Sequence, residues 1–540
     1  MEFQVADLFE AVSDQIPERE ALVLGKKRLT YAQLDKRSNK AAHMLKKIGI
    51  GKGDHIGIYA YNCIEWIEVM IGAYKIGAVP ININYRYVEE ELAYLIGNSD
   101  MVAIVYQYQF APLLKAIEER TPKLKKYIHI KESGEELPKS FNKKSREYKT
   151  LIDVESEERG LEKRSGKDMY VLYTGGTTGL PKGVMWTQED VIMTLGGGID
   201  HLTGEKFPSP EEMSKKCLAD QITALALAPL MHGAAQWQAL NSFFSGWKLI
   251  LNDQKSFDAR YIWNLISKEK VQNLTITGDA MGRPLADELP EAVKENTNID
   301  SLTILSSTAA IFSSVIKDEF LKFLPNLLII DAVGSSETGS TGLNIYDKSV
   351  KKKNAGGPTF DRPRHSTILH PKTLIPIKES DTETIGYLAR SGNVPIGYYK
   401  DKKKSASTFV EVEKTKYSLP GDQAKFNSKG QIVLLGRGSV SINSGGEKIF
   451  PEEVEAALKA HPKVFDCLVV GIPDKRWGEK VMAIIQSRDG KEIKLNDLKN
   501  SCKTYVASYK FPKELKFVKK IKRSPSGKPD YLWAKDQAIK

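Results

Sequence analysis

The first part of the chain alternates between helical and strand patterns, and this alternation restricts the fold more than any other feature. Thr30 and Gln33 form a capping-box pattern ahead of a helix whose apolar residues recur at spacings of three or four. HIGIYA, residues 55–60, follows Gly49 and is typical of a buried strand. The patterns then continue in turn: a helix over 63–76, a strand near Val79, a helix from Glu89 and a strand at MVAIVY, 101–106. This order predicts a mostly parallel sheet within an α/β fold.

The length of the chain predicts more than one domain. With 540 residues, it exceeds what a single hydrophobic core accommodates. Short strand and turn patterns predominate in the later part, and a smaller run of strands and helices ends the chain, including a strand at LKFVKKI, residues 515–521. We predict a large N-terminal domain over 1–436, made of α/β subdomains plus a small β-rich subdomain, and a small α+β domain on a hinge over 437–540. Residues 131–168 and 203–220 are charged and poor in large apolar groups, so we expect them on the surface.

Composition and charge narrow the class of protein. The four cysteines are widely spaced, so we expect neither a disulfide framework nor a zinc site, and we expect a reducing, cytoplasmic location. The N-terminus does not resemble a signal peptide, and no apolar run approaches the about 20 residues that span a bilayer. The net charge of +11 suits several polyanionic partners, but there is no zinc finger, aromatic RNA-binding signature or long basic arm. We therefore expect no nucleic-acid partner.

A glycine- and threonine-rich loop follows the apolar run Val171–Tyr173 in VLYTGGTTGLPKG. Glycines let a backbone turn sharply and bring its N–H groups close to a ligand, and successive N–H groups form a nest for phosphate oxygens. Threonine hydroxyls add donors, and a lysine adds a positive charge. The loop fits neither the Walker A pattern nor the dinucleotide pattern G-x-G-x-x-G. The candidate phosphate-binding residues are Thr174, Gly175, Gly176, Thr177, Thr178, Gly179 and Lys182.

Three later segments carry residues that suit a nucleotide. DAVGSSETG, residues 331–339, places Glu337 after a Gly-Ser-Ser run at a predicted strand end, and a carboxylate beside phosphates suits Mg²⁺. Asp422 follows a glycine, as an acidic residue that binds ribose hydroxyls does in dinucleotide sites. Lys528 lies in RSPSGKPDY, a Pro/Ser/Gly loop near the C-terminus. Taken alone, each is an ordinary turn residue.

Together, these segments are similar to the motifs of the acyl-adenylate-forming (AMP-binding) enzyme superfamily, of the bacterial fatty-acyl-CoA synthetase type. The motifs occur in the same order as in the family, over nearly the whole chain. Four further segments carry it: GAVPININYRYVEEEL (77–92), PLMHGAAQW (229–237), GYLARSGNVPIGYYKD (386–401) and INSGGEKIFPEEVE (442–455).

The resemblance implies roles for individual residues. Lys528 would bridge the carboxylate and the α-phosphate, Glu337 and Thr178 would hold Mg²⁺, and His232 would line the entry to the acyl pocket. The phosphate loop would cover the β- and γ-phosphates of ATP. The remaining expected nucleotide- and CoA-binding residues are Asp331, Ser336, Asp422, Arg437, Ser444, Gly445 and Gly446.

The activity that the resemblance implies is that of an ATP-dependent acyl-CoA synthetase in lipid or fatty acid metabolism. Such an enzyme activates a carboxylic acid, here a fatty or bulky hydrophobic one, as acyl-AMP and transfers the acyl group to coenzyme A. AMP and pyrophosphate leave, and ATP, Mg²⁺ and CoA are the cofactors and co-substrates. The expected partners are small molecules, and the sequence is compatible with a homodimer and with peripheral membrane contact.

Several positions depart from the family pattern. Gly175 replaces a serine of the phosphate loop, and Val333 replaces the tyrosine that stacks on adenine. The hinge position, usually Asp or Lys, is Ser439. Long-chain synthetases often have a tryptophan four residues after the pocket histidine, where this chain has Gln236 followed by Trp237. These variations resemble those in bacterial fatty-acyl-CoA synthetases, including some that act on sterol side chains.

Other functions and the substrate stay open at this point. A stand-alone adenylation enzyme that loads a carrier-protein thiol, a luciferase-like oxygenase and a non-catalytic basic scaffold share the implied fold. Nucleotide-dependent turnover, light emission and the thiol acceptor distinguish them. Small residues near the histidine and in TITGDAMGRPL indicate either a roomy acyl pocket or close packing; they are Gly233, Ala234, Ala235, Gly278 and Ala280.

Overall fold

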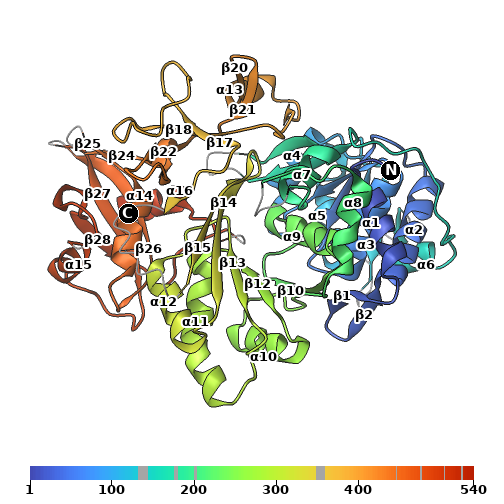
Figure 1. The fold of residues 1–540 in the computed structure, drawn as a ribbon, viewed down its shortest axis with the longest axis horizontal. Coiled ribbons are helices and arrows are strands. Elements are labelled where there is room, and N and C mark those ends of the chain that lie inside the picture. The colour runs from blue at the N-terminus through green and yellow to red at the C-terminus, as the bar shows by residue number, and fades with distance from the viewer. Residues whose placement is uncertain are drawn as a thin grey trace. The chain divides into compact units, whose positions relative to one another are not determined.

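The computed structural model describes residues 1–131, 144–175, 180–199, 204–347, 359–444, 447–474, 477–503, 505–524 and 527–540. The chain forms two compact units, each built from several segments. Figure 1 shows the fold, coloured by residue number. Unit 1 consists of Met1–Asp258, Leu265–Thr275 and Asn393–Phe409, and unit 2 of Ala259–Asn264, Ile276–Gly392 and Val410–Lys540.

A parallel sheet in unit 1 confirms the helix–strand alternation that the sequence predicts. Its strands follow the order β4 (Val79–Asn82), β3 (His55–Tyr59), β5 (Ala103–Gln107), β6 (Lys126–Ile130) and β7 (Ser145–Glu147). Helix α2 (Tyr31–Lys47) precedes β3, and α3 (Ile64–Lys75) and α4 (Glu89–Asn98) alternate with β3, β4 and β5 along the chain. The capping box of α2 is present, because Thr30 Oγ1 accepts the Gln33 N–H and Gln33 Oε1 accepts the Thr30 N–H. This cap satisfies two otherwise unpaired donors.

Unit 1 holds two further groups of strands. One has the order β12 (Asn273–Ile276), β10 (Thr223–Ala226), β11 (Lys248–Leu251), β1 (Glu20–Leu24) and β2 (Lys27–Thr30). The other is antiparallel, with β8 (Met169–Thr174), β9 (Lys182–Thr187) and β19 (Gly397–Tyr398). Helices α1 (Val5–Gln15) and α9 (Gly233–Phe244) belong to the same unit.

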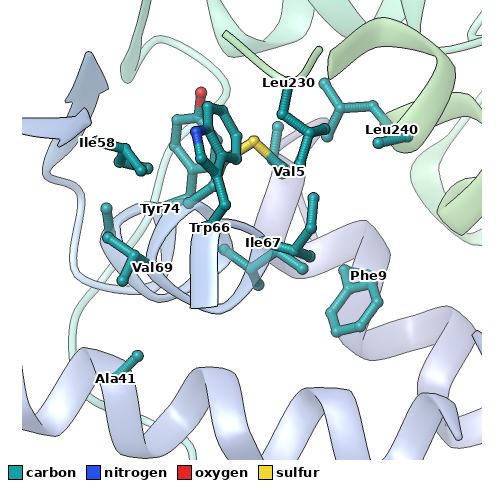
Figure 2. Close-up of a cluster of buried hydrophobic side chains, with 14 of the residues drawn as sticks. Val5, Phe9, Ala41, Ile58, Trp66, Ile67, Val69, Tyr74, Leu230 and Leu240 are labelled. Atoms are coloured by element: carbon teal, nitrogen blue, oxygen red, sulfur yellow. The ribbon is translucent and has the colours of Figure 1, made fainter. Parts of the chain in front are cut away.

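The core of unit 1 forms around α3, which is buried on nearly every side. Figure 2 shows Trp66, Ile67, Val69 and Tyr74 of this helix among side chains of α1 and α2 and of the segment that precedes α9. Each of these four side chains is at most 1% exposed. Burying a large apolar side chain contributes about 1.5–3 kcal/mol, so this cluster dominates the packing of the unit.

The two charged segments that the sequence places on the surface both contribute to the core. Within 131–168, the short helix α6 (Tyr148–Ile152) buries Tyr148, Leu151 and Ile152. Within 203–220, Met213 of the short helix α8 (Pro210–Ser214) and Cys217, just after it, are fully buried. Most of the described residues of both segments are exposed or half-buried, as predicted. The buried exceptions were not foreseen because a short element needs only two or three apolar side chains to reach the core, too few to alter the composition of the segment.

Unit 2 begins with β13 (Ile304–Ser307), β14 (Leu328–Ser335) and β15 (Gly339–Tyr346), with α11 (Gly278–Lys294) and α12 (Ser314–Phe323). A β-rich sheet follows within the described residues from Thr359 on, as the sequence predicts. Its path is β16 (Thr359–Phe360), β23 (Ile432–Arg437), β22 (Asp422–Phe426), β18 (Gly386–Ser391), β21 (Thr415–Ser418) and β20 (Phe409–Val412), with β17 (Ser366–Leu369) paired to β18.

The C-terminal part is a small α+β arrangement, as predicted (orange to red in Figure 1). Its strands are β24 (Ile442–Ser444), β25 (Glu447–Ile449), β26 (Val464–Asp474), β27 (Gly478–Ser487) and β28 (Glu514–Phe517), and its helices are α14 (Pro451–Lys459), α15 (Leu495–Cys502) and α16 (Tyr531–Ile539). Alternate residues of β26 serve two cores, with Cys467 and Val469 in one and Leu468 and Val470 in the other. The predicted strand LKFVKKI is shorter than expected, since β28 ends at Phe517.

The remaining helices are short or peripheral: α5 (Ala111–Ala116), α7 (Gln188–Leu195), α10 (Ala259–Glu269) and α13 (Lys402–Thr408). The four cysteines are free thiols, all buried. Among the described residues, no helix combines the length and the apolar character that crossing a membrane requires.

Candidate nucleotide and acyl site

The predicted phosphate loop joins two strands of unit 1. Thr174 ends β8, Lys182 begins β9, and the two residues pair across the antiparallel hairpin. The loop therefore starts and ends at one point, with Lys182 at its base. Gly176, Thr177, Thr178 and Gly179 lie outside the described residues.

Lys182 already has an acidic neighbour. Its Nζ lies 2.6 Å from Oδ2 of Asp401 and 5.7 Å from the centre of the Tyr398 ring. The hydrogen bond from Lys182 lowers the pKa of Asp401, and the N–H of Lys404 contributes in the same direction. Asp401 also caps α13 through the Lys404 N–H. The lysine that the sequence assigns to phosphate is thus held at the hairpin by a carboxylate.

Asn82, which the sequence reading did not assign, ties the phosphate hairpin to the histidine segment. It is 5% exposed, and its Nδ2 donates to the carbonyls of Tyr173 at 2.8 Å and Met231 at 2.7 Å. Its Oδ1 accepts the Tyr173 N–H at 2.8 Å. These bonds bring His232, the residue before α9, next to the end of β8. An asparagine at the carboxyl end of a buried parallel strand was the available signal, because side chains at such ends often face a site.

Gly233 provides close packing. A Cβ at Gly233 would lie 2.6 Å from Leu172 Cδ2 and 2.8 Å from Trp237 Cζ2. Trp237 is fixed in turn, because its Nε1 donates to the Tyr170 hydroxyl, which donates to Gln236 Oε1. Of the two readings of the small residues, packing therefore explains Gly233.

Packing also explains Gly278 in unit 2, whose Cβ would lie 2.4 Å from the Ile311 carbonyl oxygen. This contact belongs to a loop after β13 that the sequence reading missed. Ala309 there has φ +66°, a conformation that is uncommon for a residue with a side chain and that concentrates at functional sites. The Gly278 N–H donates to Ser307 Oγ at the end of β13. Nothing in the local composition signals this loop.

Asp331 pairs with Ser307 across β13 and β14, and Lys317 holds its Oδ2 in an ion pair. Burial raises the pKa of Asp331 despite the opposing effect of Lys317. Its Oδ1 and the Oγ1 of Thr277 are buried without a hydrogen-bond partner in the part of the chain that the structure describes. Unpaired buried polar atoms at the carboxyl edge of parallel strands suit a polar ligand.

Glu337 lies in the turn that joins β14 to β15. Its N–H donates to Ser335 Oγ, and its carbonyl accepts the Ser418 hydroxyl at 2.6 Å. Ser418 ends β21, four residues before Asp422, which begins β22 opposite Arg437 of β23. Unit 2 thus brings Glu337 and the Asp422 strand together, with Ser336 in the same turn. The described side chains include no cluster of three metal-ligating residues, but Mg²⁺ on phosphates needs only one or two carboxylates, so Glu337 fits it.

Gly527, the residue before Lys528, lies against the start of α11. Gly527 has φ +72°, and a Cβ there would lie 3.0 Å from both the Thr277 carbonyl oxygen and Ala280 Cβ. Within the loop, the Lys528 N–H donates to Ser524 Oγ. Because Thr277 adjoins Gly278, the loop lies on the same edge as Ser307 and Asp331. Ser444 ends β24, whereas Gly445, Gly446 and the side chain of Arg437 lie outside the description.

Comparison with known proteins gives two family matches, one in the large N-terminal part of the chain and one in the C-terminal part. Residues 9–389 match the family model described as AMP-binding enzyme, and residues 453–528 match that of the AMP-binding enzyme C-terminal domain. These matches bracket the boundary predicted at residue 437, which stays a prediction.

Two curated relatives and two solved structures illustrate the similarity. A 3-oxocholest-4-en-26-oate–CoA ligase of Rhodococcus rhodochrous is 45% identical, covering 99% of this chain and 96% of the relative. A medium-chain acyl-CoA ligase, Mig, of Mycobacterium avium is 38% identical over 99% and 98%. The anthranilate CoA ligase AuaEII, in complex with anthranoyl-AMP, has a TM-score of 0.85 at 20% identity over 99% and 97%. A fatty acyl CoA synthetase of Mycobacterium tuberculosis has a TM-score of 0.70 at 21% identity over 99% and 98%.

The family matches span most of the chain, and the curated relatives match nearly its full length. AMP-forming CoA ligases use ATP, Mg²⁺ and CoA, which agrees with the residue types gathered in each unit. The chain therefore belongs to the AMP-binding enzyme family, as an acid–thiol ligase of the AMP-forming acyl-CoA synthetase type.

Proposed function

We propose that this enzyme activates a large hydrophobic carboxylic acid, a medium- or long-chain fatty acid or a sterol side-chain acid, and transfers it to CoA. The observation that carries the chemistry is the place of Gly527, which lies against Thr277 and brings the loop of Lys528 to the edge that bears Asp331. The observation that carries the substrate class is the set of relatives, whose names specify a sterol acid with its carboxylate at carbon 26 or medium- and long-chain fatty acids.

The first step joins the carboxylate to the α-phosphate. A carboxylate oxygen attacks the α-phosphorus, pyrophosphate leaves, and negative charge develops on the phosphoryl oxygens. Lys528 stabilises that charge, and Lys182 with Thr174 and Gly175 binds the β- and γ-phosphates. Asp422 accepts hydrogen bonds from the ribose hydroxyls, with Arg437 beside it. Mg²⁺ held by Glu337, together with Thr178, would supply further charge neutralisation.

The second step moves the acyl group to sulfur. The CoA thiol loses its proton, the sulfur attacks the acyl carbon, and AMP leaves with both electrons of the broken carbon–oxygen bond. A free thiol has a pKa near 8.5, so a minority is ionised at neutral pH. Ser444, with Gly445 and Gly446, lines the path of the thiol arm, and His232 borders the acyl entry. The C-terminal domain rotates about a hinge near Ser439. This rotation withdraws Lys528 from the reacting centre and brings the thiol path to it, as hinge motions do in other enzymes.

A panel of acids tests the proposal. Purified enzyme, ATP and Mg²⁺ are assayed for pyrophosphate release with acetate, octanoate, palmitate, benzoate and a sterol 26-carboxylic acid, and then for thioester formation with CoA or with a phosphopantetheinylated carrier protein. We expect release with the hydrophobic acids and thioester formation with CoA. Preference for acetate or benzoate would refute the substrate class, and transfer to the carrier protein alone would favour the stand-alone adenylation alternative. A cytoplasmic location, a homodimer and peripheral membrane contact stay predictions.

A further inference from the structure

A buried ion pair joins α11 to the C-terminal domain. Lys459, the last residue of α14, donates from Nζ to Asp279 Oδ2 at 3.1 Å, and each side chain is 6% exposed. Asp279 is the second residue of α11, two residues after Thr277. Its other oxygen, Oδ1, accepts the Ser313 N–H at 2.7 Å, so both oxygens of this carboxylate are engaged.

The same lysine also lies near a second carboxylate, which connects it to the Lys528 loop. Lys459 Nζ lies 3.6 Å from Asp466 Oδ1. Arg523 donates two hydrogen bonds of 2.7 Å to that aspartate, from Nε and Nη2, and its Nη1 donates to the Gly527 carbonyl at 3.1 Å. One run of charged contacts therefore extends from the start of α11 to the residue before Lys528.

The energetics of this run differ from those of a surface ion pair. Burial lowers the pKa of Lys459, but Asp279 and Asp466 outweigh it, so the pKa lies above its ordinary value and the lysine stays charged. Removing one partner of a buried pair leaves an uncompensated charge in a poorly solvated site. Lys459 therefore strongly favours the arrangement in which Asp279 faces it, which is the arrangement that seats Gly527 on Thr277.

We propose that Asp279 and Lys459 are positioning residues that hold the Lys528 loop against α11 for acyl-AMP formation. The inference rests on the proposed role of Lys528 in that step. The pair does not touch the reacting atoms. It fixes the position of the domain that carries Lys528, and displacement of a catalytic group by about 1 Å can lower the rate a hundredfold.

A second ion pair between the same helix and the same domain provides a matched control. Arg488, just after β27, binds Asp287 of α11 at 2.9 Å, and both side chains are about one-third exposed. Exposed pairs are worth little, so Arg488→Met should leave both half-reactions near the wild-type rate. Comparing this variant with the variants of Asp279 and Lys459 therefore distinguishes a general weakening of the domain contact from loss of the buried cluster.

The experiment measures the half-reactions separately. Acyl-AMP formation is followed as single-turnover pyrophosphate release, and thioester formation as CoA consumption with synthetic acyl-AMP supplied. Asp279→Asn and Lys459→Met should each slow the first reaction about ten- to a hundredfold and leave the second within about threefold. Lys459→Arg keeps the charge and should restore much of the first rate, which also covers the case in which Lys459→Met folds poorly. Added to Lys528→Ala, neither substitution should cost more, because residues that act as a unit are not additive.

Other results would overturn the inference. Equal loss of both half-reactions, or a loss in Arg488→Met as large as in Lys459→Met, would assign the pair a general structural role. A further full loss in the Lys528→Ala background would show that the pair acts independently of that lysine. Failure of the wild-type enzyme to release pyrophosphate with any acid of the panel would instead refute the proposed function itself.

Discussion

Lys182 and Asp401 are 219 residues apart in the sequence, yet Lys182 Nζ donates to Asp401 Oδ2 at 2.6 Å. The pairing of β19 with β9 brings them together, since Tyr398 faces Val184 across these strands. A lysine that binds phosphate must either break its ion pair with this carboxylate or contact both anions at once. If Lys182 binds phosphate, as we propose, Asp401 competes with ATP for this cation.

Asp401→Asn should tighten ATP binding. The substitution removes the competing charge, while the asparagine oxygen can still cap α13. Because the pair is more than one-third exposed, the expected effect is modest, about a two- to fivefold decrease in the Kd for ATP measured by calorimetry. Asp401→Ala removes the cap as well and should lower the melting temperature, which separates the two roles. Weaker ATP binding in Asp401→Asn would instead assign the carboxylate to the nucleotide site.

Glu337→Gln should raise the Mg²⁺ concentration needed for half-maximal pyrophosphate release. A carboxylate attracts the hard cation more strongly than an amide does. The glutamine should preserve the turn, because the Glu337 backbone makes the hydrogen bonds to Ser335 and Ser418. A Mg²⁺ titration of wild type and variant at saturating ATP checks this, and superimposable titrations would remove Glu337 from the metal site.

Asp422→Ala should weaken ATP binding with little change in Mg²⁺ dependence. A carboxylate that accepts ribose hydroxyls makes charge-assisted hydrogen bonds, and losing them corresponds to a KM for ATP raised about tenfold or more. Comparison of ATP with 2′-deoxy-ATP provides the control, since the variant should discriminate less between the two nucleotides. Undiminished discrimination would show that another residue reads the ribose.

The sequence predicts the elements better than it predicts their contacts. The helices and strands of the first parallel sheet were recoverable because capping residues and hydrophobic periodicity are local. Asn82 and Ala309 were not, since their importance depends on partners over a hundred residues away or on a backbone angle. Gly233 shows the same limit, because composition cannot tell a residue that leaves room for a ligand from one that lets Trp237 approach Leu172. Asp279 and Lys459 also lack a local signal, because 180 residues separate them.

Glu10 should make stability depend on pH in the acid range. Burial raises its pKa, but the hydrogen bonds and charges of Arg164 and Lys75 lower it overall to about 2 from 4.5. A group whose pKa is lower in the folded state stabilises the fold above its unfolded pKa, and that contribution is lost as pH falls toward the folded value. The shift corresponds to at most about 3 kcal/mol.

The Glu10→Gln variant tests this linkage. Its melting temperature should lie a few degrees below that of wild type at pH 7, and the gap should narrow as the pH falls from 4.5 toward 2. Glu119→Gln, on an exposed glutamate of the same unit, serves as the control and should track wild type throughout. A gap that stays constant across this range would show that packing, rather than charge, accounts for the loss.

The basic segment 509–528 should contribute weakly to CoA binding. Several of its cations are engaged: Lys510 with Glu453, Lys522 with Asp530 and Arg523 with Asp466. Lys519 and Lys520, just after β28, are exposed and form no ion pair within the described residues. These two adjacent lysines, like the exposed Lys513, are therefore placed to attract the phosphates of CoA, although lysines near an edge strand also protect it from aggregation.

Replacing both Lys519 and Lys520 by glutamine should raise the KM for CoA by about tenfold or less at low ionic strength, because exposed charge pairs are individually weak. The effect should shrink as salt rises, since screening shortens the reach of surface charges to about 8 Å near physiological ionic strength. Pyrophosphate release in the absence of CoA should stay unchanged. A double variant of Lys491 and Lys494, exposed lysines near α15, removes the same net charge from the same domain and should leave the KM for CoA unaltered. If both double variants raised it equally, the attraction would come from the overall positive charge of the domain, and a normal KM in the first would leave only the protective role.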